Sequence, residues 1–208
     1  MPLAKFINVI CAAYGGGKEF NMPKIYIDQG HNPSGFNTGA EGNGLREQDV
    51  TYEVGRQLAA LLRRSGNYEV RLSRNSPDEV LGTSNASSLR TRVQDANAWG
   101  ADYFISIHTN ASTDRSATGV EAYSYARDTR AFDLGASIVD DLVAVTGFPD
   151  RGMKVRPGLY VLKKTNMPAV LVEIGFISNP GEAAVMESDP SLFARGIYEG
   201  IVDYIGLA

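Results

Sequence analysis

Four side chains that could bind a metal ion or transfer a proton stand out in this sequence. The chain has only two histidines, His31 and His108, and each lies at or just past the end of a predicted strand. Glu47 opens a predicted helix, and Glu173 follows the apolar run AVLV. Zinc hydrolases commonly use two imidazoles, one carboxylate and an open position for water, with a second carboxylate as general base. These residue types therefore indicate metal-assisted hydrolysis as one interpretation.

Each of these residues also has a simpler interpretation. A histidine in a globular protein is more often a satisfied polar residue than a ligand, and Glu47 suits the first turn of a helix because of the helix dipole. Glu173 is harder to explain in this way, because an unpaired buried charge is costly. A cation or a proton is therefore expected close to Glu173. Spacing alone leaves a metal site and ordinary structural roles both open.

Short β-rich runs alternate with amphipathic helices along the chain. This pattern predicts one α/β domain, a sandwich with a mostly parallel twisted sheet of about six strands and helices on both faces. The expected strands are 24–28, 68–74, 103–108, 119–125, 159–162 and 169–174. The expected helices are 46–65, 89–99, 132–143, a short one after 179–181, and a terminal one over 193–205. Ligands of such sheets bind at the carboxyl ends of the strands, where the four candidate residues should meet.

Composition excludes several classes of protein. The 208 residues suit one domain, and 43% hydrophobic with 21% charged residues is ordinary for a globular chain. A net charge of −4 favours neither nucleic acid nor an anionic membrane as a partner. No apolar run approaches the roughly 18–20 residues that span a bilayer. Cys11 is the only cysteine, so neither an internal disulfide nor a thiolate metal cluster is expected.

The amino-terminal segment differs from the rest of the chain. Residues 6–14 (FINVICAAY) follow Lys5 and are similar to the apolar part of a short signal peptide, and a second methionine stands at Met22. We expect residues 1–21 to be a leader or an expression-vector segment, with an extra strand as the alternative. The catalytic domain is then expected to cover residues 22–208.

Three longer motifs resemble those of a known family. Residues 25–47 (IYIDQGHNPSGFNTGAEGNGLRE) are similar to the opening motif of the zinc-dependent N-acetylmuramoyl-L-alanine amidases of cell-wall lysis and sporulation. Residues 105–112 (ISIHTNAS) resemble the second metal motif of that family, and residues 170–180 (VLVEIGFISNP) resemble its third motif. Gln29 and Asn32-Pro33 depart from the usual proline and Gly-Gly, which puts substrate contacts of this loop in doubt but not the ligand set.

The resemblance implies a complete assignment of roles. His31, Glu47 and His108 would bind one Zn²⁺, and Glu173 would be the catalytic carboxylate. The substrate would be peptidoglycan or a muropeptide, cut at the amide between N-acetylmuramic acid and L-alanine. The implied location is extracellular or wall-associated, including periplasm or spore cortex, with a cytoplasmic pool if the chain is phage-encoded. Protein partners, stem-peptide preference and physiological role stay open.

Other functions remain to be weighed against this one. A zinc peptidase or carboxypeptidase acting within the stem peptide would use the same ligands, and only its products would differ. An inactive wall-binding module should lack a ligand or Glu173, and a metal-free domain would hold its histidines by coincidence. Asn110, Arg74, Arg92 and Asp28 are weighed as helper residues, but a structural role is at least as well supported for each.

Overall fold

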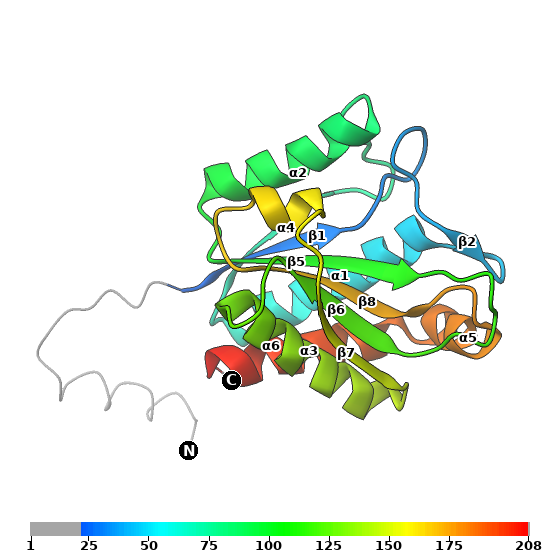
Figure 1. Ribbon diagram of the computed structural model, residues 1–208. Helices are drawn as coiled ribbons and strands as arrows, with labels where there is room; N and C mark the ends of the chain where they lie inside the picture. Colours follow the sequence, from blue (N-terminus) through cyan, green and yellow to red (C-terminus); the bar gives the residue numbers. More distant parts are fainter. Residues whose placement is uncertain (1–21, 208) are drawn as a thin grey trace, which may run out of the picture.

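The computed structural model describes residues 22–207, so the expected leader over residues 1–21 lies outside the described part of the chain. The strands are β1 (Lys24–Gln29), β2 (Glu41–Gly42), β3 (Leu45–Arg46), β4 (Glu69–Leu72), β5 (Tyr103–Asn110), β6 (Val120–Ser124), β7 (Asp150–Val155) and β8 (Ala169–Phe176). The helices are α1 (Glu47–Ser65), α2 (Asn85–Trp99), α3 (Arg130–Thr146), α4 (Tyr160–Lys164), α5 (Pro180–Ser188) and α6 (Pro190–Ile205). Figure 1 shows their arrangement.

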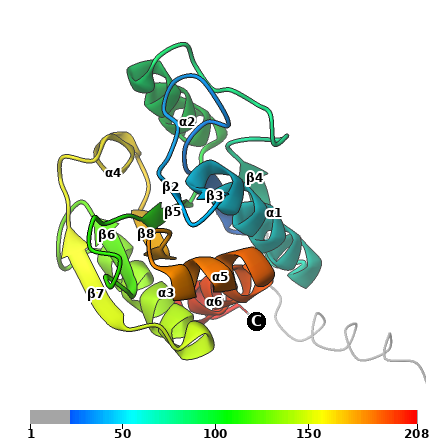
Figure 2. The same ribbon diagram turned by 90° about the vertical axis from the view of Figure 1, so that its right-hand side faces the viewer.

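A six-stranded sheet with the order β4-β1-β5-β8-β6-β7 forms the centre of the domain. All neighbouring strands in it are parallel except β6 and β8, which are antiparallel. The predicted mostly parallel sheet of six strands is therefore confirmed. The carboxyl ends of β1, β5 and β8 and the first residues of β6 and β7 consequently share one edge, which Figure 2 views from the front.

Helices cover both faces of the sheet, as predicted. α1, α3 and α6 lie on one face, and α2 and α4 lie on the other (Figure 1). Because side chains alternate along a strand, Ile25 and Ile27 of β1 pack toward the first group of helices, whereas Tyr26 between them packs toward the second. Tyr26 stacks on Phe104 of β5 with 5.5 Å between ring centroids. Each described helix is too short or too polar to cross a bilayer.

One expected strand was wrong and one observed strand was missed, so the number of strands in the sheet still agrees with the expectation. The run 159–162, expected as a strand, forms the start of α4, with Leu159 as its N-cap. Four apolar residues are too few to separate the two periodicities. The strand β7 was missed because its sequence DRGMKV is polar and contains glycine, as suits an exposed edge strand. The short pair β2–β3 was also not expected, and it lies between β1 and α1.

The start of α2 also differs from the expectation. The helix begins at Asn85 rather than at 89, because Ser84 and Ser87 form a reciprocal capping box. The hydroxyl of Ser84 accepts from the Ser87 amide at 3.1 Å, and Ser87 accepts from the Ser84 amide at 2.9 Å. This pair satisfies two donors that a helix start otherwise leaves free. Polar residues thus extend the helix beyond its apolar pattern.

Candidate metal centre

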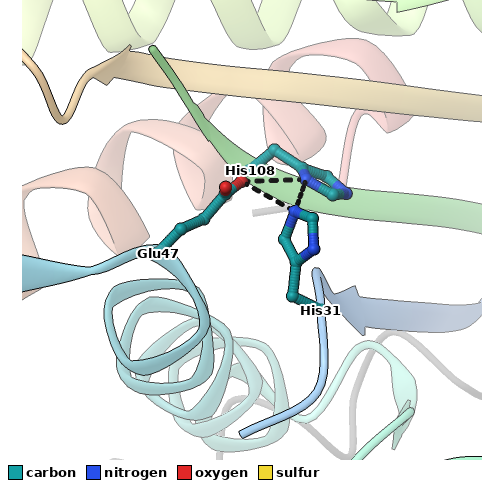
Figure 3. A group of neighbouring side chains, drawn as sticks. All are labelled: His31, Glu47 and His108. Atoms are coloured by element: carbon teal, nitrogen blue, oxygen red, sulfur yellow. Dashed lines mark hydrogen bonds and ion pairs between the residues drawn. The ribbon is translucent and has the colours of Figure 1, made fainter. Parts of the chain in front are cut away.

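His31, Glu47 and His108 meet at the carboxyl edge of the sheet (Figure 3). His31 Nε2 lies 3.1 Å from His108 Nδ1 and 3.2 Å from Glu47 Oε1. His108 Nδ1 lies 3.0 Å from Glu47 Oε1. The three residues come from the loop after β1, the first turn of α1 and the end of β5. The structure therefore brings together the ligands that the sequence motifs suggested.

The spacing of these atoms matches what a zinc ion requires. Tetrahedral zinc binds nitrogen and oxygen at about 2.0–2.1 Å, which corresponds to ligand separations of roughly 3.3 Å. The separations of 3.0–3.2 Å between the three ligand atoms are only slightly shorter. The side chains of His31 and His108 keep 20% and 18% of their surface exposed, so solvent reaches the centre.

The backbone at His31 is held in an unusual conformation. His31 has a φ of +69°, which is uncommon for a residue with a side chain. Its Nδ1 lies 3.2 Å from the carbonyl oxygen of Asn37, so that a protonated Nδ1 leaves Nε2 free as a ligand. The guanidinium of Arg92 donates to the carbonyl oxygens of His31 at 2.5 Å and Gln29 at 2.6 Å. These contacts fix both the turn and the ring.

Glu47 is positioned by backbone amides as well as by the imidazoles. Its Oε1 accepts from the amide of Thr109 at 3.0 Å, and its Oε2 accepts from the amide of Ala40 at 2.9 Å. Burial raises the pKa of Glu47, but hydrogen bonds with His108 and His31 outweigh burial and lower that pKa below its ordinary value. Glu47 is therefore an anion held in one position by several hydrogen bonds. The simpler interpretation, a first-turn glutamate stabilised by the helix dipole, does not require these contacts.

Two glycines allow the ligands to approach the backbone. A Cβ atom at Gly30 would lie 2.6 Å from His108 Cε1 and 2.6 Å from the carbonyl oxygen of Ile107. A Cβ atom at Gly39 would lie 2.7 Å from Glu47 Oε2. Both separations are shorter than carbon atoms tolerate, so any side chain at these positions would displace a ligand.

Glu173 lies in the same row of the sheet as His108. The register pairs His108 of β5 with Glu173 of β8, and Glu173 with Glu121 of β6, so the three side chains share the face that carries α2 and α4. Glu173 Oε2 is buried and has no hydrogen-bond partner among the described residues. Burial, with the charges of Glu47 and Glu121, raises the pKa of Glu173 to about 8. A raised pKa agrees with the proton that the sequence analysis expected near Glu173 as the alternative to a cation.

A small pocket opens beside the two imidazoles. Its volume is about 160 Å³, and it lies between α2 and α4 on the sheet face that carries His108 and Glu173. Its apolar wall is formed by Leu89, Leu159, Val161 and Leu171. A larger hollow between α1 and α6 contains none of the four candidate residues. The smaller pocket is therefore the one that lies next to His31 and His108.

The four helper residues have distinct structural places. Arg92 and Asp28 form a buried ion pair at 2.6 Å, and Asp28 also accepts from the Ser106 hydroxyl at 2.8 Å. Arg74 is buried and donates to the carbonyl oxygen of Gln48 at 2.6 Å. Burial, followed by the charge of Arg92, lowers the pKa of Arg74 to about 10. Of these residues, Arg92 contacts His31, and it does so at the main-chain carbonyl oxygen.

Asn110, the remaining helper, donates to Glu121 Oε1 at 2.9 Å, and its side chain forms no hydrogen bond with the three metal-ligand candidates. Glu121 itself was not singled out from the sequence, although it lies in the expected strand 119–125. Its two cationic partners, Arg151 and Lys154, come from β7, the strand that was missed, so no expected element brought them to Glu121.

Replacing Arg92 by methionine is expected to destabilise the fold strongly. The change leaves Asp28 buried with only the Ser106 hydroxyl as a partner, and breaking one side of a buried ion pair costs about 3–5 kcal/mol. The control is Arg71→Met, which breaks an exposed pair with Asp95 and should cost less than about 1 kcal/mol. Denaturant unfolding of both variants checks this, and equal losses of stability would contradict it.

Fold and site together define an α/β domain with a two-histidine, one-glutamate centre suited to a single metal ion. The N-acetylmuramoyl-L-alanine amidase family (Amidase_3) matches residues 25–203, and the chain belongs to this family. The resemblance expected from the motifs is therefore confirmed. The chain is a hydrolase of the amidase class.

Relatives and solved structures agree with this placement. N-acetylmuramoyl-L-alanine amidase CwlM of Bacillus licheniformis is 38% identical over 90% of this chain and 70% of its own length. The sporulation-specific N-acetylmuramoyl-L-alanine amidase of Bacillus subtilis (strain 168) is 35% identical over 86% of this chain and 67% of its own length. The CwlD amidase of Clostridioides difficile, solved in complex with the GerS lipoprotein, superimposes with a TM-score of 0.82 at 27% identity, covering 89% of this chain and 100% of that one.

Proposed function

We propose that this protein is a zinc-dependent peptidoglycan hydrolase that cleaves the amide between N-acetylmuramic acid and L-alanine. The observation that carries the proposal is the cluster of His31 Nε2, His108 Nδ1 and Glu47 Oε1, with the unpartnered carboxylate oxygen of Glu173 in the same row of the sheet. The names of the relatives supply the bond that is cut. Glu173, His31, Glu47 and His108 are the residues to which we assign the reaction.

The residues of the site divide the work of the reaction. When bound, zinc supplies Lewis-acid chemistry that acidifies water and polarises a carbonyl. His31, His108 and Glu47 would hold the ion, and Glu47 contributes a negative charge that its hydrogen bonds with His108 and His31 keep in place despite its burial. Glu173 takes the proton of the attacking water and later gives it to the amine of L-alanine. A divalent charge beside Glu173 would lower its pKa from about 8, so that Glu173 is ionised at neutral pH.

Digestion of purified peptidoglycan tests this function. We expect new ends that consist of a free lactyl carboxylate on the muramic acid and a free amine on L-alanine, both identified by mass. Treatment with a chelator should abolish these products, and added zinc should restore them. Cleavage between two amino acids of the stem would instead support the alternative of a zinc peptidase, and binding to the wall without products would support an inactive module.

The proposed location follows from the substrate. Peptidoglycan lies outside the cytoplasmic membrane, so we infer action in the cell wall, the periplasm or the spore cortex. The relatives include a sporulation-specific amidase and an endolysin of Bacillus phage SPP1, so a phage-encoded chain with a cytoplasmic pool fits the same chemistry. Fractionation of cells that express the natural protein would distinguish these cases.

A further inference from the structure

Three basic side chains on the edge strand β7 and just after its end lie toward the sheet face that carries Glu121 and Glu173. Lys154 is paired with Tyr123 of β6, and Arg156 follows two residues later, so both lie on the face that carries Glu121 and Glu173. Arg151 would face the other way in a regular strand. A bulge corrects this, because three steps from Asp150 to Met153 oppose two steps on β6 and Gly152 has a φ of +70°. Bulges beside active sites commonly redirect side chains in this way.

Glu121 anchors two of these cations at a buried point. It is only 2% exposed, and its Oε2 accepts from Arg151 Nε at 2.8 Å and from the ammonium group of Lys154. Its Oε1 accepts from Asn110 Nδ2 at 2.9 Å and from the hydroxyl of Tyr123. Burial raises the pKa of Glu121, but hydrogen bonds from Lys154, Tyr123 and Arg151 outweigh burial and lower it to about 2. Glu121 is therefore a permanent anion that holds the cations in register.

The cations keep hydrogen-bond donors that point to no protein acceptor. The side chains of Arg151 and Lys154 are each 39% exposed. Within residues 22–207, Lys154 makes one hydrogen bond, Arg151 uses Nε and Nη1 but not Nη2, and the guanidinium of Arg156 lies 5.2 Å over the ring of Tyr123 without an ion pair. Glu121 thus fixes Arg151 and Lys154, and most donors of the three side chains make no hydrogen bond within the described residues.

Nearby carboxylates do not supply the missing acceptors. Glu182 of α5 accepts from the Thr118 hydroxyl and from the amides of Gly119 and Phe176. Asp150 accepts from the amide of Gly152 at 2.7 Å, and within the described chain it forms no ion pair. Among the described residues, the basic side chains therefore present hydrogen-bond donors without acceptors beside the row formed by His108, Glu173 and Glu121, in a protein whose net charge is −4.

We propose that Arg151, Lys154 and Arg156, here called the basic ridge, bind the carboxylate of the stem-peptide residue that follows L-alanine. This inference rests on the proposed function and names a determinant of substrate specificity. The carboxyl group of muramic acid is consumed in the amide to be cut, so the formal anion nearest to that bond belongs to the peptide. Glu121 places the ridge beside Glu173 in the sheet register, which is where the leaving peptide must pass to receive its proton.

The test compares two muropeptides that differ only in the second stem residue, D-glutamate with a free carboxylate or D-isoglutamine with an amide. The main variant is Lys154→Gln, and Arg156→Gln is the second variant because Arg156 does not contact Glu121. Arg64→Gln, an exposed arginine on α1, is the matched control. KM and kcat are measured for each protein, and dissociation constants are measured in a Glu173→Gln background.

We expect Lys154→Gln to raise KM and the dissociation constant for the acidic muropeptide about tenfold, since hydrogen bonds to charged groups contribute at least that much. Arg156→Gln should raise both about threefold, which is a rim effect. Values for the amidated muropeptide, and all values for the control, should change less than about twofold. Added salt should weaken binding of the acidic muropeptide to the wild type more than binding of the amidated one.

Three outcomes would contradict the proposed role of the basic ridge, and a fourth would contradict only the proposed function. Equal losses on both muropeptides would assign Lys154 a structural role, and no loss in either variant would remove the subsite. Loss of binding to phosphate-rich wall polymer, with muropeptide discrimination unchanged, would assign the ridge to a different anion. If the wild type binds the acidic muropeptide preferentially but does not cut its muramoyl amide, the proposed function fails and the ridge stands.

Discussion

Replacing Glu173 by glutamine is expected to abolish hydrolysis while the metal site stays filled. Glu173 is not among the three clustered ligand residues, and its buried Oε2 has no partner in the described chain. Glutamine preserves the shape of the side chain but accepts no proton from water. Loss of a positioned general base lowers kcat by about 10²–10⁴-fold. Turnover of muropeptides and the zinc content of the same preparation are the two measurements.

The matched control for this variant is Glu53→Gln. Glu53 lies on α1 and pairs with Arg56 at the surface, so its loss should alter neither zinc content nor turnover. Removing the negative charge of Glu173 should also leave zinc binding intact or slightly weaker. Turnover by Glu173→Gln within threefold of the wild type would show that another group accepts the proton. Loss of zinc from this variant would instead place Glu173 among the ligands.

Replacing His108 by alanine is expected to remove both the metal and the activity. The three ligand atoms lie within 3.2 Å of one another, so each imidazole supplies one of only three protein bonds to the ion. Loss of a direct ligand should weaken zinc binding more than the 10–100-fold that follows loss of an outer hydrogen bond. Zinc content after dialysis against a weak chelator and muropeptide turnover both test this prediction.

His31→Ala should also lose both the metal and the activity. The two histidine variants together distinguish a metal-binding role of the histidines from a purely structural one. Buried hydrogen-bonded histidines that bind no ion would change stability but not metal content. Asn37→Ala is the control, because it removes the side-chain amide of Asn37 but keeps the main-chain carbonyl oxygen that faces His31 Nδ1. Full zinc content in either His31→Ala or His108→Ala would contradict the proposed ligand set.

The site could be located from the sequence because strand ends determine where side chains gather. His108 and Glu173 lie near the carboxyl ends of β5 and β8, which are neighbouring parallel strands, and parallel strands place their carboxyl ends at one edge. Glu47 follows the loop that leads away from β1, so α1 starts at the same edge. Order along the chain and strand polarity therefore predicted that these side chains gather at one edge, and the resemblance of the motifs supplied their assignment as metal ligands.

Contacts between distant elements could not be predicted in the same way. The hold of Arg92 on the carbonyl oxygens of Gln29 and His31 depends on how α2 packs against the end of β1. The anchoring of Lys154 by Glu121 depends on a bulge in β7, whose polar sequence shows no alternation. α4 was mistaken for a strand because Leu159–Leu162 is apolar and short. Each of these features depends on tertiary packing rather than on local periodicity.

The most direct test of the central claim is anomalous X-ray scattering at the zinc edge from crystals of the purified protein. The account predicts one zinc peak per chain, at about 2.0–2.2 Å from His31 Nε2, His108 Nδ1 and a carboxylate oxygen of Glu47. Glu173 should lie outside this bonding distance. A fully occupied crystal with zinc bound elsewhere, or with imidazoles that hydrogen-bond to each other and no metal between them, would contradict the claim.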